Sequence, residues 1–130
     1  MFEQLSQQVI NRAQAQARDQ GFAVCISVVD DAGLLRHFVR MDDAVPGAID
    51  VSLKKARTAA LFRTDSAELG MEAQPGGAIY SLEATNGGLI SFGGGVVLRD
   101  EHGKVIGAVG VAGATVEADQ VIALQAAGRP

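Results

Sequence analysis

Two polar side chains lie on the apolar face of a helix that the sequence predicts over residues 48–62. At about 100° per residue, the alanines and large apolar residues of this segment share one broad face, and Ser52 and Lys55 fall inside it. A lysine in such a face must extend its ammonium to the surface, pair with a carboxylate or bind a ligand. Two interpretations of Lys55 stay open: a packed side chain whose charge is paired, and a ligand-binding group.

Arg40 is a second basic candidate, because it ends a predicted strand directly before Met41, Asp42 and Asp43. A guanidinium beside a loop can hold a carboxylate through two parallel hydrogen bonds. The competing interpretation is an exposed arginine that pairs with Asp42 or Asp43, an interaction of little energetic weight. Arg40 is therefore a candidate for binding a carboxylate group of a ligand.

His37 and His102 are the two histidines of the chain. His102 lies in a predicted turn, where we expect it to be solvated. His37 lies within a predicted strand, on the side that also carries Leu35 and Val39, where a neutral imidazole can ligate iron or simply form a hydrogen bond. No second ligand follows at metal-binding spacing nearby, so a metal site made of protein groups alone is not predicted.

Glycine is frequent in the second half of the chain, above all in the run Gly93–Gly95. The backbone N–H groups of Gly94 and Gly95 can bind an anion, or the run can simply be a flexible entry into a strand. Gly107–Gly113 has a glycine at every third position, but it lies within the last predicted strand and lacks GxGxxG spacing. It predicts no dinucleotide site and favours instead a close approach of a helix or ligand.

Two segments of similar pattern predict the strands that position these residues. In each, an apolar run is followed by an acidic turn ending in glycine, at Gly33 or Gly103, and then by a second apolar run. This is typical of antiparallel strands joined by a tight turn. The first strand is apolar on both faces and is expected in the centre of the sheet, while the second is more charged and is expected near an edge. The expected strands are 22–29, 34–41, 96–99 and 104–112.

Helices are predicted on both sides of these strand pairs. Apolar residues at helical spacing predict helices over 3–19 and 48–62. Capping residues predict a short helix from Thr64 or Asp65 and a last helix from Thr115 through 126. Residues 72–92 show no readable pattern. Because no Pro- or Ser-rich linker divides the chain, we expect a single domain over 1–130, of the α+β class.

Composition excludes several classes of protein. The 130 residues are 48% hydrophobic with a net charge of -4, which predicts a folded globular protein and disfavours nucleic acid as the main partner. Cys25 is the single cysteine, so it is expected to be a small buried side chain and no intrachain disulfide can form. The N-terminus is too polar for a signal peptide and no apolar run is long enough to span a bilayer, so a cytoplasmic protein is expected.

Five segments together resemble the GlcG/HbpS-like family of haem-binding or haem-degrading domains. The resemblance covers nearly all of the chain, and the segments are specific as a set. Family members usually have Ser where Ala112 stands. The segments are Val28–Gly33, Arg40–Asp42, Lys55–Ala59, Gly93–Gly95, and Val105–Thr115 followed by Asp119.

The resemblance implies a fold and a range of functions. The fold is a profilin-like α/β sandwich, in which helices pack on a five-stranded antiparallel sheet. Members form homo-oligomers, and some bind haem. A related domain is fused to PduO-type corrinoid adenosyltransferases of diol utilisation, and other members are encoded beside glycolate or diol catabolism genes. No iron ligand common to the family maps onto this chain, so His37 is put forward on its chemistry alone.

Three functions follow as hypotheses. The preferred one, by family analogy, is a homo-oligomeric accessory protein of glycolate or diol catabolism that binds haem or a related tetrapyrrole. Arg40 and Lys55 would meet the propionates, Gly94 and Gly95 would lie nearby, and His37 would approach the iron. The second is a catabolic enzyme for a small carboxylate, with Lys55 as base or electrostatic clamp. The third is a structural protein whose alanine-rich helix faces build an oligomer.

Overall fold

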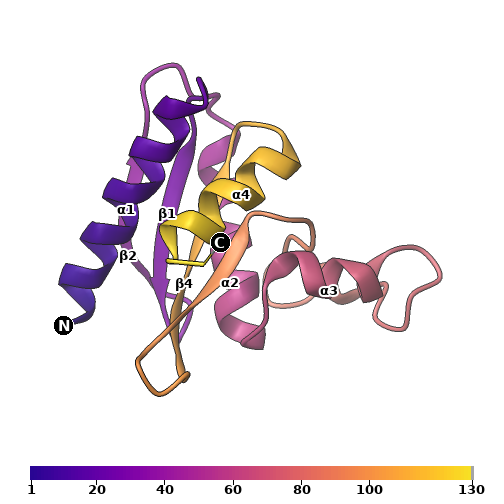
Figure 1. Ribbon diagram of the computed structural model, residues 1–130. Helices are drawn as coiled ribbons and strands as arrows, with labels where there is room; N and C mark the ends of the chain where they lie inside the picture. Colours follow the sequence, from indigo (N-terminus) through magenta and orange to yellow (C-terminus); the bar gives the residue numbers. More distant parts are fainter. Residues whose placement is uncertain (130) are drawn as a thin grey trace.

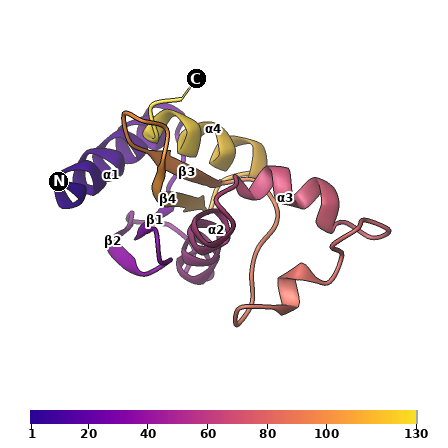
Figure 2. The ribbon, with the colours of Figure 1, turned by 90° about the horizontal axis from the view of Figure 1, so that it is seen from below.

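An antiparallel sheet with the strand order β2-β1-β4-β3 lies between helices on its two faces (Figures 1 and 2). The computed structural model describes residues 1–129. Helices α1 and α4 pack on one face and α2 on the other (Figure 2). The elements are α1 (Phe2–Asp19), β1 (Cys25–Asp30), β2 (Leu35–Arg40), α2 (Ala48–Phe62), α3 (Ser66–Ala73), the 3₁₀ helix η1 (Leu82–Ala84), β3 (Gly95–Arg99), β4 (Val105–Ala112) and α4 (Val116–Ala126).

The sheet has four strands, so the expectation of five, taken from the family resemblance, is wrong for residues 1–129. The four strands that the residue pattern predicts are the ones that form. Between α3 and β3 the chain contains turns and η1 instead of a fifth strand. Gly76, Gly87 and Gly88 adopt φ values of 85°, 73° and 105° there, which are incompatible with extended backbone. The α+β class itself is confirmed.

Strand β1 is central and β2 is an edge strand, as predicted. All residues of β1 except Asp30 are buried, whereas Leu35 and Arg36 of β2 are exposed. Alternation along β1 divides its side chains between two cores. Ile26 and Val28 belong to the core under α1 and α4, and Val29 belongs to the core under α2. This division fixes which helix each side chain of the neighbouring strands faces.

Helix α2 lies unusually close to the sheet, because small residues line both surfaces. Ala56, Ala59 and Ala60 are fully buried on the helix. On β4, a β-carbon at Gly110 would overlap the carbonyl oxygen of Ser52. The alanines of α2 therefore face the sheet of the same chain. The sequence predicts that either a helix or a ligand approaches the glycines of β4 closely, and in the structure it is helix α2.

The segment that includes α3 and η1 extends away from the sheet (Figures 1 and 2). Its start covers the outer edge of β3: the N–H of Val97 donates to Asp65 Oδ1 at 3.0 Å, and Arg129 pairs with Asp65 at 2.6 Å. Asp65 precedes α3 as predicted, but its carboxylate caps this strand edge instead of the helix. Among residues 1–129, no helix is long and apolar enough to cross a membrane.

Candidate functional site

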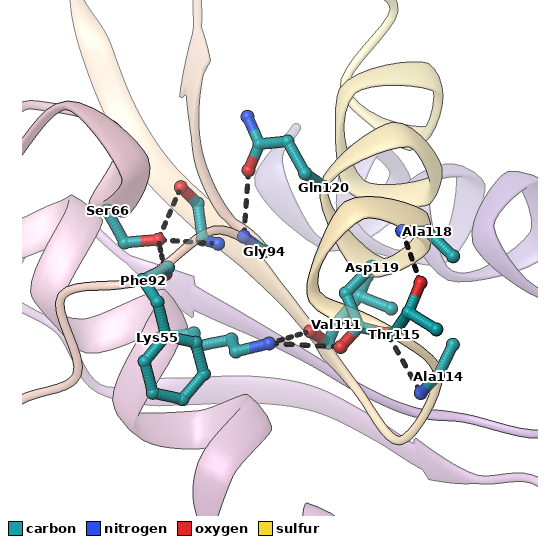
Figure 3. Close-up of polar contacts among 11 residues, drawn as sticks. Lys55, Ser66, Phe92, Gly94, Val111, Ala114, Thr115, Ala118, Asp119 and Gln120 are labelled. Carbon is teal, nitrogen blue, oxygen red and sulfur yellow. Dashed lines mark hydrogen bonds and ion pairs between the residues drawn. The ribbon is translucent and has the colours of Figure 1, made fainter. Parts of the chain in front are cut away.

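Lys55 is buried at the end of the sheet and its ammonium has three neighbours (Figure 3). Nζ donates to the Val111 carbonyl oxygen at 2.9 Å and to Asp119 Oδ2 at 3.1 Å. It also lies 5.1 Å from the centre of the Phe92 ring, within range of a cation–π interaction. The predicted position of Lys55 inside the apolar face of its helix is confirmed, and Asp119 is the carboxylate that pairs with it.

Asp119 is held in place by the start of α4. The Thr115 hydroxyl accepts from the Ala118 N–H at 3.0 Å and caps the helix as predicted. Asp119 Oδ1 accepts from the Ala114 N–H at 3.0 Å, which leaves Oδ2 for Lys55. The sequence contains a signal for this partner that our reasoning missed. Asp119 shares a helical face with Ile122 and Ala126, so it too is a charge in an apolar stripe.

Burial moves both members of the pair toward their neutral forms. Desolvation lowers the pKa of Lys55, and the negative charge and hydrogen bond of Asp119 only partly oppose this shift. Desolvation raises the pKa of Asp119, opposed first by Lys55 and then by the hydrogen bond from Ala114. The two pKa shifts are opposite in direction, but both come first from desolvation and both favour the neutral form. The pair can therefore exchange a proton more readily than an exposed lysine and aspartate.

Gly94 and Gly95 lie against Lys55, with their backbone donors engaged inside the chain. The Gly94 N–H donates to Gln120 Oε1 at 2.8 Å, and the Gly95 N–H donates to Ser66 Oγ at 2.9 Å. The anion-binding nest considered from the sequence therefore has no free donor at these two positions. A β-carbon at Gly94 would lie 2.7 Å from Lys55 Nζ, so the glycine serves to make room for the ammonium.

A shallow pocket of about 310 Å³ opens beside this pair. We call it the Lys55 pocket. Lys55 and Asp119 contribute its charged groups, and the remaining lining is apolar or glycine. Phe92, Val45 and Val116 are 45%, 58% and 47% exposed, so apolar side chains also reach solvent around it. The other lining residues are Gly47, Ala48, Val51, Ala112, Gly113 and Ala114.

His37 lies on the opposite face of the sheet. It pairs with Val28, whose side chain is in the core under α1, and it is two strands away from β4. Its Nδ1 is 3.2 Å from Ser6 Oγ on α1. His37 also lines a depression of about 360 Å³ together with residues of the first turns of α1, among them Glu3 and Gln7. The other predicted histidine, His102, is exposed in its turn as expected.

Arg40 lies on the same strand as His37, but its side chain leaves the opposite face, because Arg40 pairs with Cys25, which belongs to the core cluster beside α2. Its Nε and Nη2 donate to the Ala44 carbonyl oxygen at 3.2 and 3.1 Å, so the structure engages it with the backbone instead of with Asp42 or Asp43. It lines a depression of about 400 Å³ with Gln14 and Arg18. We call the surface formed by Gln7, Gln14, Arg18 and His37 the α1/β2 face.

The predicted site residues thus fall into three places. The structure brings Lys55, Gly94 and Gly95 together, places His37 on the α1/β2 face and places Arg40 on the other face of β2, so the expected shared site of His37 and Arg40 is not formed. Cys25 is buried as predicted, and burial raises the pKa of its thiol, opposed by nearby Arg40. Among residues 1–129, no three His, Cys, Asp or Glu side chains lie close enough together to hold a metal ion.

Fold and site together define the class of this protein: an α+β sandwich whose helices cover both faces of an antiparallel sheet, with a depression on each side. The chain belongs to the HbpS-like family. The family described as "Haem degrading protein HbpS-like" matches residues 3–128. The identification made from the sequence segments is therefore confirmed.

Relatives and solved structures agree with this assignment. An "Uncharacterized 15.0 kDa protein in dhaT-dhaS intergenic region" of Citrobacter freundii is 44% identical over 113 residues, covering 85% of this chain and 78% of the relative. The corrinoid adenosyltransferase PduO of the same organism is 37% identical over 123 residues, and this chain spans 36% of its length. The "Crystal Structure of PduOC:Heme Complex" superposes with a TM-score of 0.91 at 35% identity, covering 96% of this chain and 91% of that one.

Proposed function

We propose that this protein binds haem or a related tetrapyrrole on its α1/β2 face, as an accessory protein in small-molecule catabolism of the glycolate or diol type. Membership of the HbpS-like family supports a ligand-binding role. So does the close structural match to a domain that was crystallised with heme. The observation that carries the proposal is the position of His37: an oriented imidazole beside a surface depression.

The His37 ring has the hydrogen bonding of a metal ligand. A ligating histidine normally engages its second ring nitrogen with a hydrogen-bonding partner, which fixes the tautomer and the ring orientation. Ser6 Oγ fills this role at Nδ1, and it also donates to the Glu3 carbonyl oxygen at 2.8 Å. Nε2 is then the nitrogen through which His37 would hold iron. Bound haem would supply a redox-active iron, while the protein binds and orients it.

The other end of the α1/β2 face suits the propionates. Arg18 lines a depression there, and its guanidinium is well suited to a carboxylate. Arg40 is three residues from His37, so its side chain leaves the other face of β2, bonded to the Ala44 carbonyl oxygen, and does not reach the same haem edge. Lys55 lies across the sheet, so it has no part in this haem site.

We further propose that the functional form is a homo-oligomer. The depression beside His37 is open and holds about 360 Å³, so a flat macrocycle seated there keeps much of its apolar surface in water. A second copy covering that surface would remove the cost of its exposure. Light scattering with and without haemin tests this proposal: we expect a multimer, and a monomer in both conditions would contradict it.

Haemin titration tests the ligation. We expect a shift of the Soret band at micromolar protein that is lost in His37→Ala and kept in His102→Ala, a matched control because His102 is exposed. Arg18→Gln should weaken binding without changing the shape of the spectrum. An unchanged spectrum in His37→Ala would overturn the iron assignment. A loss of binding in Lys55→Met, with His37→Ala unaffected, would move the site to the Lys55 pocket.

A further inference from the structure

The Lys55–Asp119 pair is not needed for a well-packed interior. Removing two charges from water costs desolvation free energy, and their mutual attraction offsets this cost only in part. Well-packed apolar side chains of similar size stabilise such places as well or better. Yet Lys55 is 1% exposed and Asp119 is 3% exposed, in contact with each other. Such a pair at the edge of a pocket is typical of a site whose chemistry uses a buried amine next to a buried carboxyl.

The position of the pair beside the pocket limits the charge and size of the molecule that can react with the amine. Lys55 and Asp119 are the ionisable groups that line it, and the rest of the lining is apolar or glycine. An anionic ligand there would meet the Asp119 carboxylate, whose distance from Lys55 Nζ is only 3.1 Å. A ligand without charge avoids this repulsion. The volume of about 310 Å³ suits a small molecule with a short apolar chain.

The neighbours of the amine provide what a reaction at its nitrogen requires. The Val111 carbonyl oxygen and Asp119 Oδ2 accept hydrogen bonds from Nζ and so hold it in one orientation. Asp119 is the adjacent proton donor and acceptor. The lowered pKa of Lys55 gives it a larger unprotonated fraction than an exposed lysine has at the same pH.

Phe92 covers the amine beside the pocket. Its ring lies over Nζ with the centroid 5.1 Å away, and the side chain is 45% exposed. Its backbone is anchored, because the Phe92 carbonyl oxygen accepts a hydrogen bond from Ser66 Oγ at 2.7 Å. Rotation of the ring about its own side-chain bonds is therefore the smallest movement that opens Lys55 to the pocket.

We propose that Lys55 captures small uncharged aldehydes as an imine in this pocket. The amine nitrogen forms a bond to the carbonyl carbon, and the carbonyl oxygen takes the proton of Asp119. The ammonium nitrogen of the resulting carbinolamine returns one proton to Asp119, which passes it to the hydroxyl group as water leaves. The products are an iminium at Lys55, the Asp119 carboxylate and one water molecule. Addition of water reverses the sequence.

Reductive trapping tests this capture on the wild-type protein. Propionaldehyde and sodium cyanoborohydride convert the imine into a stable secondary amine, heavier than lysine by the mass of the aldehyde less one oxygen atom. Peptide mapping then compares Lys55 with Lys54 and Lys104, the other lysines of the chain. We expect Lys55 to be labelled severalfold faster than Lys104 at neutral pH, because burial lowers the pKa of Lys55 and raises its unprotonated fraction. Equal or slower labelling of Lys55 would overturn the proposal.

Variants distinguish a loss of imine formation from a loss of folding. Lys55→Arg retains the charge but forms no imine, so the fast adduct should disappear, whereas Lys104→Arg should leave it unchanged. Phe92→Ala should accelerate trapping, and Asp119→Asn should slow it. Circular dichroism checks that each variant is folded. A fast adduct that persists in Lys55→Arg would also overturn the proposal. None of these readouts involves haem, so the result is independent of the function proposed above.

Discussion

The polar side chains on the two sides of the sheet differ in burial and in hydrogen bonding. In the Lys55 pocket, both charges are buried and bonded to each other. On the α1/β2 face, His37 is half-buried and one of its ring nitrogens has a protein partner, which leaves the other for a ligand. Burial therefore decides the chemistry available to each site. The buried pair is suited to proton transfer and covalent chemistry, while the imidazole beside an open depression is suited to binding.

The largest difference between the two regions should appear when one buried charge is left without its partner. We expect Lys55→Met to lower the free energy of unfolding by about 3–5 kcal/mol. The double variant Lys55→Met/Asp119→Asn should recover most of this loss, because no charge remains buried. Urea denaturation measures both. Lys54→Met is the matched control: its exposed i,i+4 pair with Asp50 should cost less than about 0.5 kcal/mol. Equal costs at positions 54 and 55 would contradict the assignment.

A smaller loss of stability is expected from Gly94→Ala. This glycine has a φ of 122°, and a β-carbon would lie 2.6 Å from the Val111 oxygen and 2.7 Å from Lys55 Nζ. Strain and crowding together should cost about 2–4 kcal/mol. Gly103→Ala shares the positive φ, at 82°, but no heavy atom lies within 4 Å, so it should cost only about 1 kcal/mol. Thermal denaturation of both variants gives the comparison, and a loss at Gly103 as large as at Gly94 would contradict it.

The pH dependence of the free energy of unfolding should show the direction of both pKa shifts in the Lys55 pocket. Because the folded pKa of Asp119 is raised above its ordinary 3.8, the native state binds the extra proton, and stability falls as pH rises from 3.8 through the raised value. The folded pKa of Lys55 is lowered below 10.5, so the unfolded state binds more protons there and stability rises with pH through that window.

Subtracting the stability of the Lys55→Met/Asp119→Asn variant isolates this contribution. The difference between wild type and variant should decline above pH 3.8 and recover toward pH 10.5. Urea titrations across this range measure it. A difference that does not change with pH would mean that burial leaves the two groups unshifted.

The smallest effect on stability is expected at the α1/β2 face. Ser6→Ala removes the hydrogen bond to His37 Nδ1 and should cost only about 0.5–1.5 kcal/mol. Its effect on haemin affinity should be larger, about tenfold, because the ring loses its orienting partner. Haemin titration measures this, and reductive trapping at Lys55 should be unaffected. Unchanged haemin affinity in Ser6→Ala would contradict a role of Ser6 in orienting His37.

Much of the fold follows from local patterns in the sequence. Glycine-terminated turns located both strand pairs, helical spacing located α2, and Thr115 located the start of α4. These signals depend on neighbours within a few residues, so no tertiary information is needed to interpret them. The segment between α3 and β3 escaped prediction because its conformation depends on glycine dihedral angles and not on hydrophobic period. The fifth strand was carried over from the family and had no pattern of its own.

The sequence alone determined that Lys55 is a charge in an apolar face and that His37 shares a strand face with Val39. It did not determine their partners, because Asp119 and Ser6 lie far from them along the chain and meet them only through packing. The tertiary structure decided that Lys55 and His37 lie on opposite faces of the sheet. A strand places alternate side chains on opposite faces, and only the order of strands and the helices covering each face determine which distant residues meet.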